Sequence, residues 1–245
     1  MRVNKPTLFI ADLHLSQEQP ETVRRFLAFL SGPASGAHSL YILGDLFEVW
    51  LGDDAIPDFC QPIINAMQRL TTDGVAIYLQ HGNRDFLLSE AFCRQTGCQL
   101  LPEQFTLDLH GRKTLLMHGD QLCTDDHAYQ AMRQQIRSPA WISSFLEKPL
   151  DERQNFARSL RSYSESETRS KAAEIMDVNP DTVARYMREH GVSQLIHGHT
   201  HRPASHNFHL AEDRAVRHVL PEWQQQPGML LCNDEGCRLQ FFDQP

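Results

Sequence analysis

The chain lacks any long hydrophobic run. Apolar residues make up 41% of its 245 residues, but no stretch approaches the roughly 18 consecutive apolar residues that a membrane-spanning helix needs. Residues 1–11 hold one short apolar run, which is too short for a secretory signal. We therefore expect a protein of the cytoplasm.

Positive charge and paired cysteines are also scarce. The 23 Lys and Arg residues stand against 31 Asp and Glu, a net charge of −8, which argues against a protein that binds nucleic acid through its phosphates. No C-x-x-C pair occurs, and in a reducing compartment we expect all cysteines to be thiols. They are Cys60, Cys93, Cys98, Cys123, Cys232 and Cys237. Low-complexity tracts and internal repeats are missing, and at this length one large α/β domain or two small ones would each have an adequate core. We read residues 1–245 as a single domain.

Strand and helix patterns alternate along the chain. Apolar runs bounded by turn residues predict strands at residues 7–11, 40–43, 75–79, 114–117 and 194–196. Helical spacing predicts helices around 20–30, around 63–70, and from Pro180, capped by Asn179, to Gly191. The alternation predicts βαβ units, a largely parallel sheet, and a site beyond the carboxyl ends of its strands.

Two segments depart from this alternation. The tail predicts antiparallel strands, with 214–220 extended and 229–232 and 237–242 flanking the turn 233–236. Cys232 and Cys237 would then face each other as thiols. Residues 127–175 lack strand signals and predict an inserted helical lid. Because this segment has eight basic against six acidic residues in an acidic chain, we expect it to meet an anion.

Five of the predicted strands end in a polar cluster. Residues i and i+2 of an extended segment point to the same side, so Asp12 with His14, and His199 with His201, are expected to present two ligands to one place. Carboxylate, imidazole and amide ligands without thiolate favour Mn²⁺, Mg²⁺, Fe²⁺ or Zn²⁺. The clusters are 11–14, 44–45, 81–85, 118–120 and 197–201.

Seven candidate ligands are too many for one ion. Two ions that share a bridging carboxylate, about 3.5–4 Å apart, fit the number and are typical of phosphatases and nucleases. The sequence therefore predicts phosphoryl-transfer chemistry. The seven residues are Asp12, His14, Asp45, Asn83, His118, His199 and His201.

The order Asp-x-His, Gly-Asp, Gly-Asn-x-Asp, His-Gly-Asp and Gly-His-x-His resembles the calcineurin-like metallophosphoesterase superfamily. The longer strings 9–15, 41–48, 81–86, 118–124 and 196–203 are similar to those of members that cleave the pyrophosphate bond of UDP-2,3-diacylglucosamine in lipid A synthesis. The resemblance runs from about residue 7 to residue 203. It implies a four-layer α/β/β/α sandwich with an inserted helical lid.

The resemblance also implies roles for particular residues. Two Mn²⁺ ions would be held, the first by Asp12, His14, Asp45 and His201, and the second by Asp45, Asn83, His118 and His199. Water would attack the α-phosphorus, giving UMP and 2,3-diacylglucosamine 1-phosphate, with Asp45 and Arg84 central to catalysis. His81 and His197 would lie just outside the ligand set. The implied substrate contacts are Asn83, Arg84, Asp126, Ser164, Thr168, Lys171 and His199, although Thr168 stands where the family pattern has Asn.

Two observations on the residues themselves agree with this reading. Arg84 stands where many superfamily members have a His that protonates a leaving alkoxide, which an arginine cannot do. A phosphate leaving group needs little protonation, so Arg84 favours a pyrophosphate substrate that it can grip with two donors. Ser164, Thr168 and Lys171 share one face of a predicted helix.

Other functions remain open from the sequence. A phosphoesterase or pyrophosphatase acting on another nucleotide diphosphate is the nearest alternative. Protein phosphatases and dinucleoside polyphosphatases usually carry Asp-Arg-Gly after Gly-Asp, where this chain has residues 46–50, Leu-Phe-Glu-Val-Trp. A nuclease fits the acidic charge poorly, and a metal-free scaffold fits the intact ligand set poorly. We expect a lipid-linked UDP-sugar substrate, peripheral contact with the cytoplasmic face of the inner membrane, and neither a nucleic acid nor an obligate protein partner.

Overall fold

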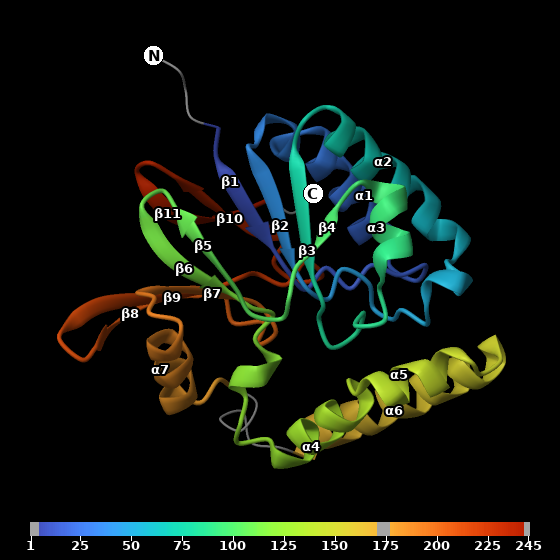
Figure 1. Ribbon diagram of the computed structural model, residues 1–245. Helices are drawn as coiled ribbons and strands as arrows, with labels where there is room; N and C mark the ends of the chain where they lie inside the picture. The colour runs from blue at the N-terminus through green and yellow to red at the C-terminus, as the bar shows by residue number, and fades with distance from the viewer. Residues whose placement is uncertain (1–4, 171–176, 243–245) are drawn as a thin grey trace.

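Two β-sheets face each other in the computed structural model, which describes residues 5–170 and 177–242, and of 162–170 only the backbone (Figure 1). The first sheet contains β1 (Thr7–Ile10), β2 (Ser39–Leu43), β3 (Ala76–Gln80), β4 (Gln99–Leu100), β10 (Gly228–Asn233) and β11 (Gly236–Phe241). Its strand order is β11-β10-β1-β2-β3-β4, and β1 to β4 are parallel.

The second sheet contains β5 (Phe105–Leu109), β6 (Arg112–Leu116), β7 (Gln194–His197), β8 (Ala204–Leu210) and β9 (Asp213–Val219). Its order is β5-β6-β7-β9-β8. The strands β6, β7 and β9 are parallel, and β5 and β8 pair antiparallel at the two edges. The sequence prediction that residues 214–220 belong to an antiparallel tail is therefore only half right, because β9 also pairs in parallel with β7.

Helices cover the outer faces of both sheets. The first sheet carries α1 (Pro20–Ser31), α2 (Gln61–Thr72) and α3 (Glu90–Thr96), and the second carries α7 (Pro180–Glu189). The side chain of Asn179 caps α7 by accepting the Thr182 N–H at 3.0 Å, as the sequence predicted. Short 3₁₀ turns occur at Pro33–Gly36, Asp53–Ala55, Asp58–Cys60 and Asp120–Leu122.

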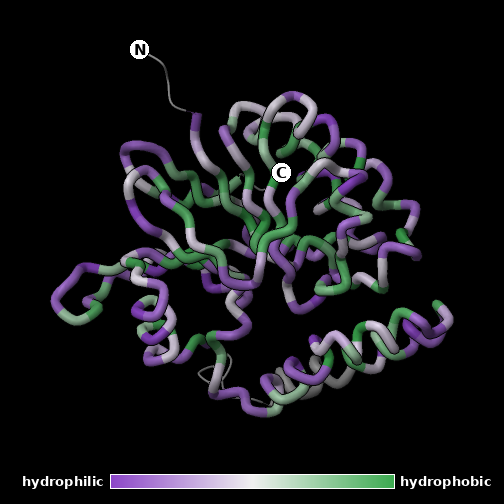
Figure 2. The backbone as a smooth tube through the Cα atoms, viewed as in Figure 1, coloured by the Kyte–Doolittle hydropathy of each residue, from purple (hydrophilic) through white to green (hydrophobic). Residues whose placement is uncertain are grey.

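Strand β1 shows why the sandwich has four layers. Leu8 and Ile10 pack toward α1 and α2, whereas Phe9 points the other way, into the space between the sheets. Both faces of the strand are buried, so it is hydrophobic throughout instead of alternating. Figure 2 shows the same hydrophobic strands at the centre and hydrophilic turns outside. A third apolar cluster lies under α7, and the predicted α/β/β/α fold is confirmed.

Three further helices follow the second sheet's β6. They are α4 (His127–Ile136), α5 (Pro139–Leu146) and α6 (Leu150–Ser170), within the residues where the sequence predicts a helical insertion. Trp141 and Phe145 of α5 stack at 4.6 Å and both contact Phe156 of α6. In Figure 1 these helices lie apart from those that cover the sheets. Among the described residues, no helix is both long and apolar enough to cross a bilayer.

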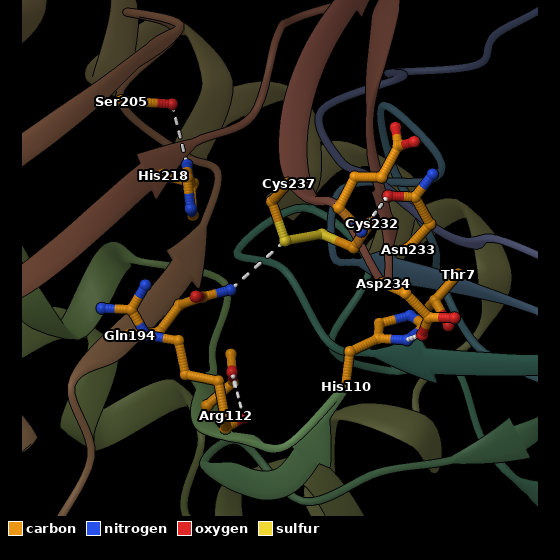
Figure 3. Close-up of a disulfide and its surroundings, with 12 residues drawn as sticks. Thr7, His110, Arg112, Gln194, Ser205, His218, Cys232, Asn233, Asp234 and Cys237 are labelled. Atoms are coloured by element: carbon orange, nitrogen blue, oxygen red, sulfur yellow. Dashed lines mark hydrogen bonds and ion pairs between the residues drawn. A yellow bond between two sulfur atoms is a disulfide. The ribbon is translucent and has the colours of Figure 1, made fainter.

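The C-terminal hairpin contains a disulfide that the sequence analysis did not expect. Cys232 of β10 and Cys237 of β11 are paired in register, with their Cα atoms 4.1 Å apart, and their sulfur atoms are bonded (Figure 3). The expectation of thiols here was wrong. It rested on the reducing compartment, whereas the register places the two side chains directly opposite each other, close enough to bond.

His218 of β9 provides a pH test of the fold. Its Nδ1 lies 2.8 Å from Ser205 Oγ (Figure 3), and burial, aided by the charge of Arg112, lowers its pKa to about 4. In the unfolded chain this histidine binds a proton with a pKa near 6.5. Between about pH 6.5 and pH 4, therefore, the unfolded chain binds this proton and the folded protein does not. We expect the free energy of unfolding to fall as pH drops from about 6.5 to about 4.

Urea unfolding at a series of pH values measures this effect. The variant His218→Gln should lose less stability than the wild type across the window, while the exposed control His38→Gln should follow the wild type. If the stability of His218→Gln and that of the wild type changed equally with pH, the lowered pKa of His218 would be contradicted.

Candidate metal centre

The candidate ligands lie where the carboxyl ends of five strands meet. Asp12, Asp45 and Asn83 follow β1, β2 and β3 of the first sheet, and His118 and His199 follow β6 and β7 of the second. The site is thus built at the shared end of both sheets, as parallel strands predict.

The backbone of these ligand segments is left-handed rather than extended. The φ angles are positive at Asp12 (55°), His14 (50°), Asp45 (52°), His199 (69°) and His201 (54°). Such conformations cost energy in residues other than glycine and concentrate at functional sites. The expectation that His199 and His201 face one place as alternate residues of a strand was therefore wrong. Their side chains reach two different groups.

The first group consists of Asp12, His14 and His201. His201 Nε2 lies 3.5 Å from Asp12 Oδ1 and 3.3 Å from His14 Nε2. One ligand atom of each residue falls within 4.8 Å of the others. These three side chains could hold one cation.

The second group surrounds Asn83. Its Oδ1 lies 2.9 Å from both His118 Nε2 and His199 Nδ1. Asp45 Oδ2 lies 3.7 Å from His118 Nε2 and 3.8 Å from His14 Nε2, so a single carboxylate oxygen faces histidines of both groups. Asp12 joins them too, because one of its oxygens lies within 4.8 Å of ligand atoms of Asp45 and His118.

Three features of the site suit a divalent cation. Among the described residues, the buried Asp12 Oδ1 has no hydrogen-bond partner. A Cβ at Gly82 would collide with Asp45 Oδ1, and one at Gly198 would collide with Asp12 Oδ2, so both glycines let the backbone approach the carboxylates. The donors are oxygen and imidazole nitrogen, the set preferred by Mn²⁺, Mg²⁺, Fe²⁺ and Zn²⁺.

The charges of the site act strongly on its own titrating groups. Burial by itself would raise the pKa of Asp12, yet nearby histidines hold that pKa well below its usual range. Burial also opposes the charging of His14, but Glu48, Asp45 and Asp12 raise its pKa to about 9. His199 is different, because burial and the neighbouring His118 lower its pKa to about 4 and keep it neutral. The carboxylates thus create a field that favours positive charge.

Asp85 is a residue that the sequence reasoning missed. Its buried carboxylate accepts the N–H groups of Gly82 at 2.8 Å and Leu46 at 2.7 Å, which ties the segment after β2 to that after β3. The signal was present in the string His-Gly-Asn-Arg-Asp, whose last residue was read only as part of the pattern. His81 and His197 lie outside both groups, bonded at 2.7 and 2.8 Å to the backbone carbonyls of Leu88 and Gly198.

The expected substrate contacts lie in several places. The backbone N–H of Arg84 donates to Asp45 Oδ1 at 2.8 Å, and its side chain lies beside the site. Asp126 lies at the start of α4 and caps it by accepting the Tyr129 N–H at 3.1 Å. Ser164 and Thr168 fall in α6, but their side chains, like all of Lys171, lie outside the described residues.

A cleft of about 300 Å³ separates these loops from α4 to α6. We call the polar end of this cleft the part of its lining around Glu48, where Arg84 and Arg161 both contact Glu48 and Asn83 precedes Arg84. We call its apolar end the cluster of aromatic rings that Phe86, Trp141, Phe145 and Phe156 form in the same lining. The cleft can therefore accept a molecule with an anionic head and a hydrophobic tail.

The basic residues of this helical segment already meet anions of the protein itself. Arg133 of α4 donates to Asp120 Oδ2 at 2.6 Å and to Glu103 Oε1 at 2.7 Å. Arg137 donates to Glu103 at 2.6 Å and to the Gly82 carbonyl at 2.7 Å. Part of the charge excess that the sequence assigned to an outside anion is thus used to attach α4 to the ligand loops.

Two facing sheets with carboxylate, amide and histidine side chains at their shared edge, able to hold divalent cations, are the arrangement of a metallophosphoesterase. The family model for calcineurin-like phosphoesterases matches residues 5–203, and the chain belongs to this family. An archaeal phosphodiesterase of known structure shares the fold, with a TM-score of 0.50 and 11% identity over 97% of this chain and 99% of its own.

Curated relatives are more similar in sequence. The UDP-2,3-diacylglucosamine hydrolase of Pseudomonas fluorescens is 48% identical over 238 residues, which cover 96% of this chain and 94% of that protein. The protein of the same name from Pseudomonas aeruginosa is 48% identical over 94% of this chain and 96% of its own. That of Pseudomonas syringae pathovar tomato is 47% identical over 96% and 95%.

The glycine next to Asp45 tests the site directly. In Gly82→Ala the new methyl group would displace the Asp45 carboxylate, so we expect Mn²⁺ affinity to fall at least about tenfold, as when the support of a ligand is lost. Isothermal titration of the purified protein with Mn²⁺ measures it. Gly36→Ala is the matched control, because nothing lies within 4 Å of its Cβ. Equal affinity of both variants would show that Asp45 is no ligand.

Proposed function

We propose that this protein hydrolyses the pyrophosphate bond of UDP-2,3-diacylglucosamine by attack of water on the α-phosphorus. The products are UMP and 2,3-diacylglucosamine 1-phosphate, lipid X, in lipid A biosynthesis. The observation that carries the proposal is the match of 48% identity over 96% of the chain to hydrolases of this name. The family supplies the phosphoesterase chemistry, and the cleft supplies an arginine-lined end for an anionic head and an apolar end for a hydrophobic tail.

Two ions, which we propose to be Mn²⁺, would be divided between the two groups. Asp12, His14, Asp45 and His201 would hold the first, and Asp45, Asn83, His118 and His199 the second. Asp45 is the proposed bridge because its Oδ2 lies at nearly equal distances from His14 and His118. Bound divalent ions lower the pKa of water toward 7 and neutralise charge on phosphoryl oxygens.

The protein's own residues would orient the diphosphate. The Arg84 N–H fixes Asp45 Oδ1, while its guanidinium at the polar end of the cleft is placed to donate to phosphate oxygens. Asn83 and His199 are neighbours on one side of the site, with Asn83 Oδ1 2.9 Å from His199 Nδ1. Because the leaving group is itself a phosphate, an arginine at this position suffices where an alkoxide would need an acid.

The helical segment 127–175 would act as a lid within the single domain 1–245. The apolar end of the cleft would take the acyl chains, and Asp126, Ser164, Thr168 and Lys171 would contact the nucleotide and glucosamine. Leu146 is exposed at the end of α5, and Leu150 and Phe156 are exposed on α6. This apolar surface supports peripheral contact of the lid with the cytoplasmic face of the inner membrane, where the substrate resides.

Release of UMP tests the proposal. We expect purified protein in detergent to release UMP from UDP-2,3-diacylglucosamine when Mn²⁺ is added and to lose this activity with a chelator. A generic phosphomonoester and a dinucleoside polyphosphate should turn over poorly. Asp45→Asn should lack turnover while keeping its fold. Equal turnover of the generic substrates would remove the lipid substrate and leave a phosphoesterase of another nucleotide diphosphate.

Arg84 provides a second test. Arg84→Ala removes charged hydrogen bonds to the diphosphate, so we expect kcat/KM to fall about 10- to 100-fold, with Arg84→Lys losing less because it keeps the charge. Steady-state UMP release measures both. Arg24→Ala, at an exposed ion pair of α1, is the matched control and should be unaffected. A fully active Arg84→Ala would exclude the proposed contact.

A further inference from the structure

Glu48 is fixed beside the candidate ligand His14 by the backbone. The segments after β1 and β2 run together past the ends of their strands, through a parallel bridge between Leu15 and Phe47. The Leu15 N–H donates to the Leu46 carbonyl at 2.9 Å, and the Glu48 N–H donates to the Leu15 carbonyl at 3.1 Å. The Glu48 side chain is 12% exposed, so its carboxylate is enclosed by the site.

One oxygen of Glu48 determines which nitrogen of His14 is free. Glu48 Oε2 lies 3.1 Å from His14 Nδ1. The contact is an ion pair, and Nδ1 has no partner in full hydrogen-bond geometry among the described residues. An ionised carboxylate only accepts, so the charge of Glu48 beside Nδ1 favours the proton of the ring on that nitrogen. In the neutral ring that a metal ligand must have, the lone pair of Nε2 then lies on the side of Asp45 Oδ2 and His201 Nε2. A carboxylate behind a ligating histidine fixes the ring in this manner at many metal sites.

The other oxygen of Glu48 faces the cleft. Its Oε1 lies 3.4 Å from Arg161 Nη1 of α6 and 3.7 Å from Arg84 Nη1 of the loop after β3. The two guanidinium groups would repel each other without a shared anion between them.

We propose that Glu48 is a positioning residue that joins the two halves of the site. Through Oε2 it orients His14 for metal, and through Oε1 it keeps Arg84 and Arg161 side by side for the diphosphate. The second half rests on the proposed function, whereas the first concerns metal binding alone. Glu48 ends the string 41–48 of the sequence pattern, where it has no assigned role, and among the described residues the groups of possible ligands do not include it.

Two substitutions separate the halves. Glu48→Gln keeps an oxygen that can accept from His14 Nδ1 but removes the charge that holds the arginines. Glu48→Met keeps the length of the side chain and removes both functions. Glu212→Gln, in the exposed turn between β8 and β9, changes the net charge equally and is the control. Thermal unfolding of each variant checks that it folds. If Glu48→Met does not fold, Glu48→Gln, which is nearly isosteric with the wild type, still tests the role of the Glu48 charge.

Mn²⁺ titration of the protein decides the first half without substrate. We expect Glu48→Met to bind Mn²⁺ about 10- to 100-fold more weakly and Glu48→Gln to bind within about threefold of the wild type. Nitrogen-15 spectra of the histidine rings, assigned with His14→Gln, should lose the Nδ1–H signature of His14 only in Glu48→Met. Wild-type affinity and an unchanged spectrum in folded Glu48→Met would overturn this half.

Steady-state UMP release decides the second half. We expect Glu48→Gln to raise KM several-fold, up to about fivefold as for an exposed ion pair, with kcat little changed because the metal ligands stay in place. A lower or unchanged KM would overturn the arginine role, since Glu48 would then compete with the substrate for the arginines or leave them unaffected. If the wild type released no UMP, the proposed function would fail, but the titration would still decide the role of Glu48 toward His14.

Discussion

The burial of two carboxylates at one edge of the sandwich is the constraint on which the rest of this structure depends. Asp12 and Asp45 are 0% and 2% exposed, and an ionised carboxylate removed from water is costly unless it is paired. One oxygen of each accepts a backbone N–H, from His199 and Arg84 respectively. The remaining oxygens face histidines, so the fold is arranged to receive positive charge there.

This constraint explains the unusual backbone around the site. Loops from five strands must approach until their side chains touch, which requires left-handed turns at the candidate ligands and glycines where a Cβ would strike a carboxylate. Strained backbone of this kind persists only where the surrounding structure is rigid. The sheets supply this rigidity with apolar packing on both faces, and Asp85 supplies it locally by holding two of the loops together through their N–H groups.

Charge also attaches the helical segment to this base. Arg137, directly after α4, donates to the Gly82 carbonyl, one residue before Asn83. Arg153 of α6 is 4% exposed and donates to the Leu51 carbonyl and to Asp54 Oδ1. Charge-assisted bonds of this kind are strong and directional. Arg137 and Arg153 therefore hold the helical side of the cleft in place against the loops that carry the candidate ligands. Glu48 extends the same connection to His14.

The sequence by itself determined the chemistry of the site and most of its scaffold. The strands before Asp12, Asp45, Asn83, His118 and His199, the cap at Asn179 and the C-terminal hairpin follow from local patterns. The prediction of a second sheet came from the resemblance to the family. Apolar runs look alike in either sheet, so periodicity alone could not divide the strands between two sheets or show that β9 pairs in parallel with β7. Only the tertiary structure brought Glu48 to His14 and Asp85 to Leu46, and showed that Cys232 and Cys237, which the sequence had placed opposite each other as thiols, are bonded. Such contacts depend on register and loop conformation, which are determined by packing between segments far apart in the chain.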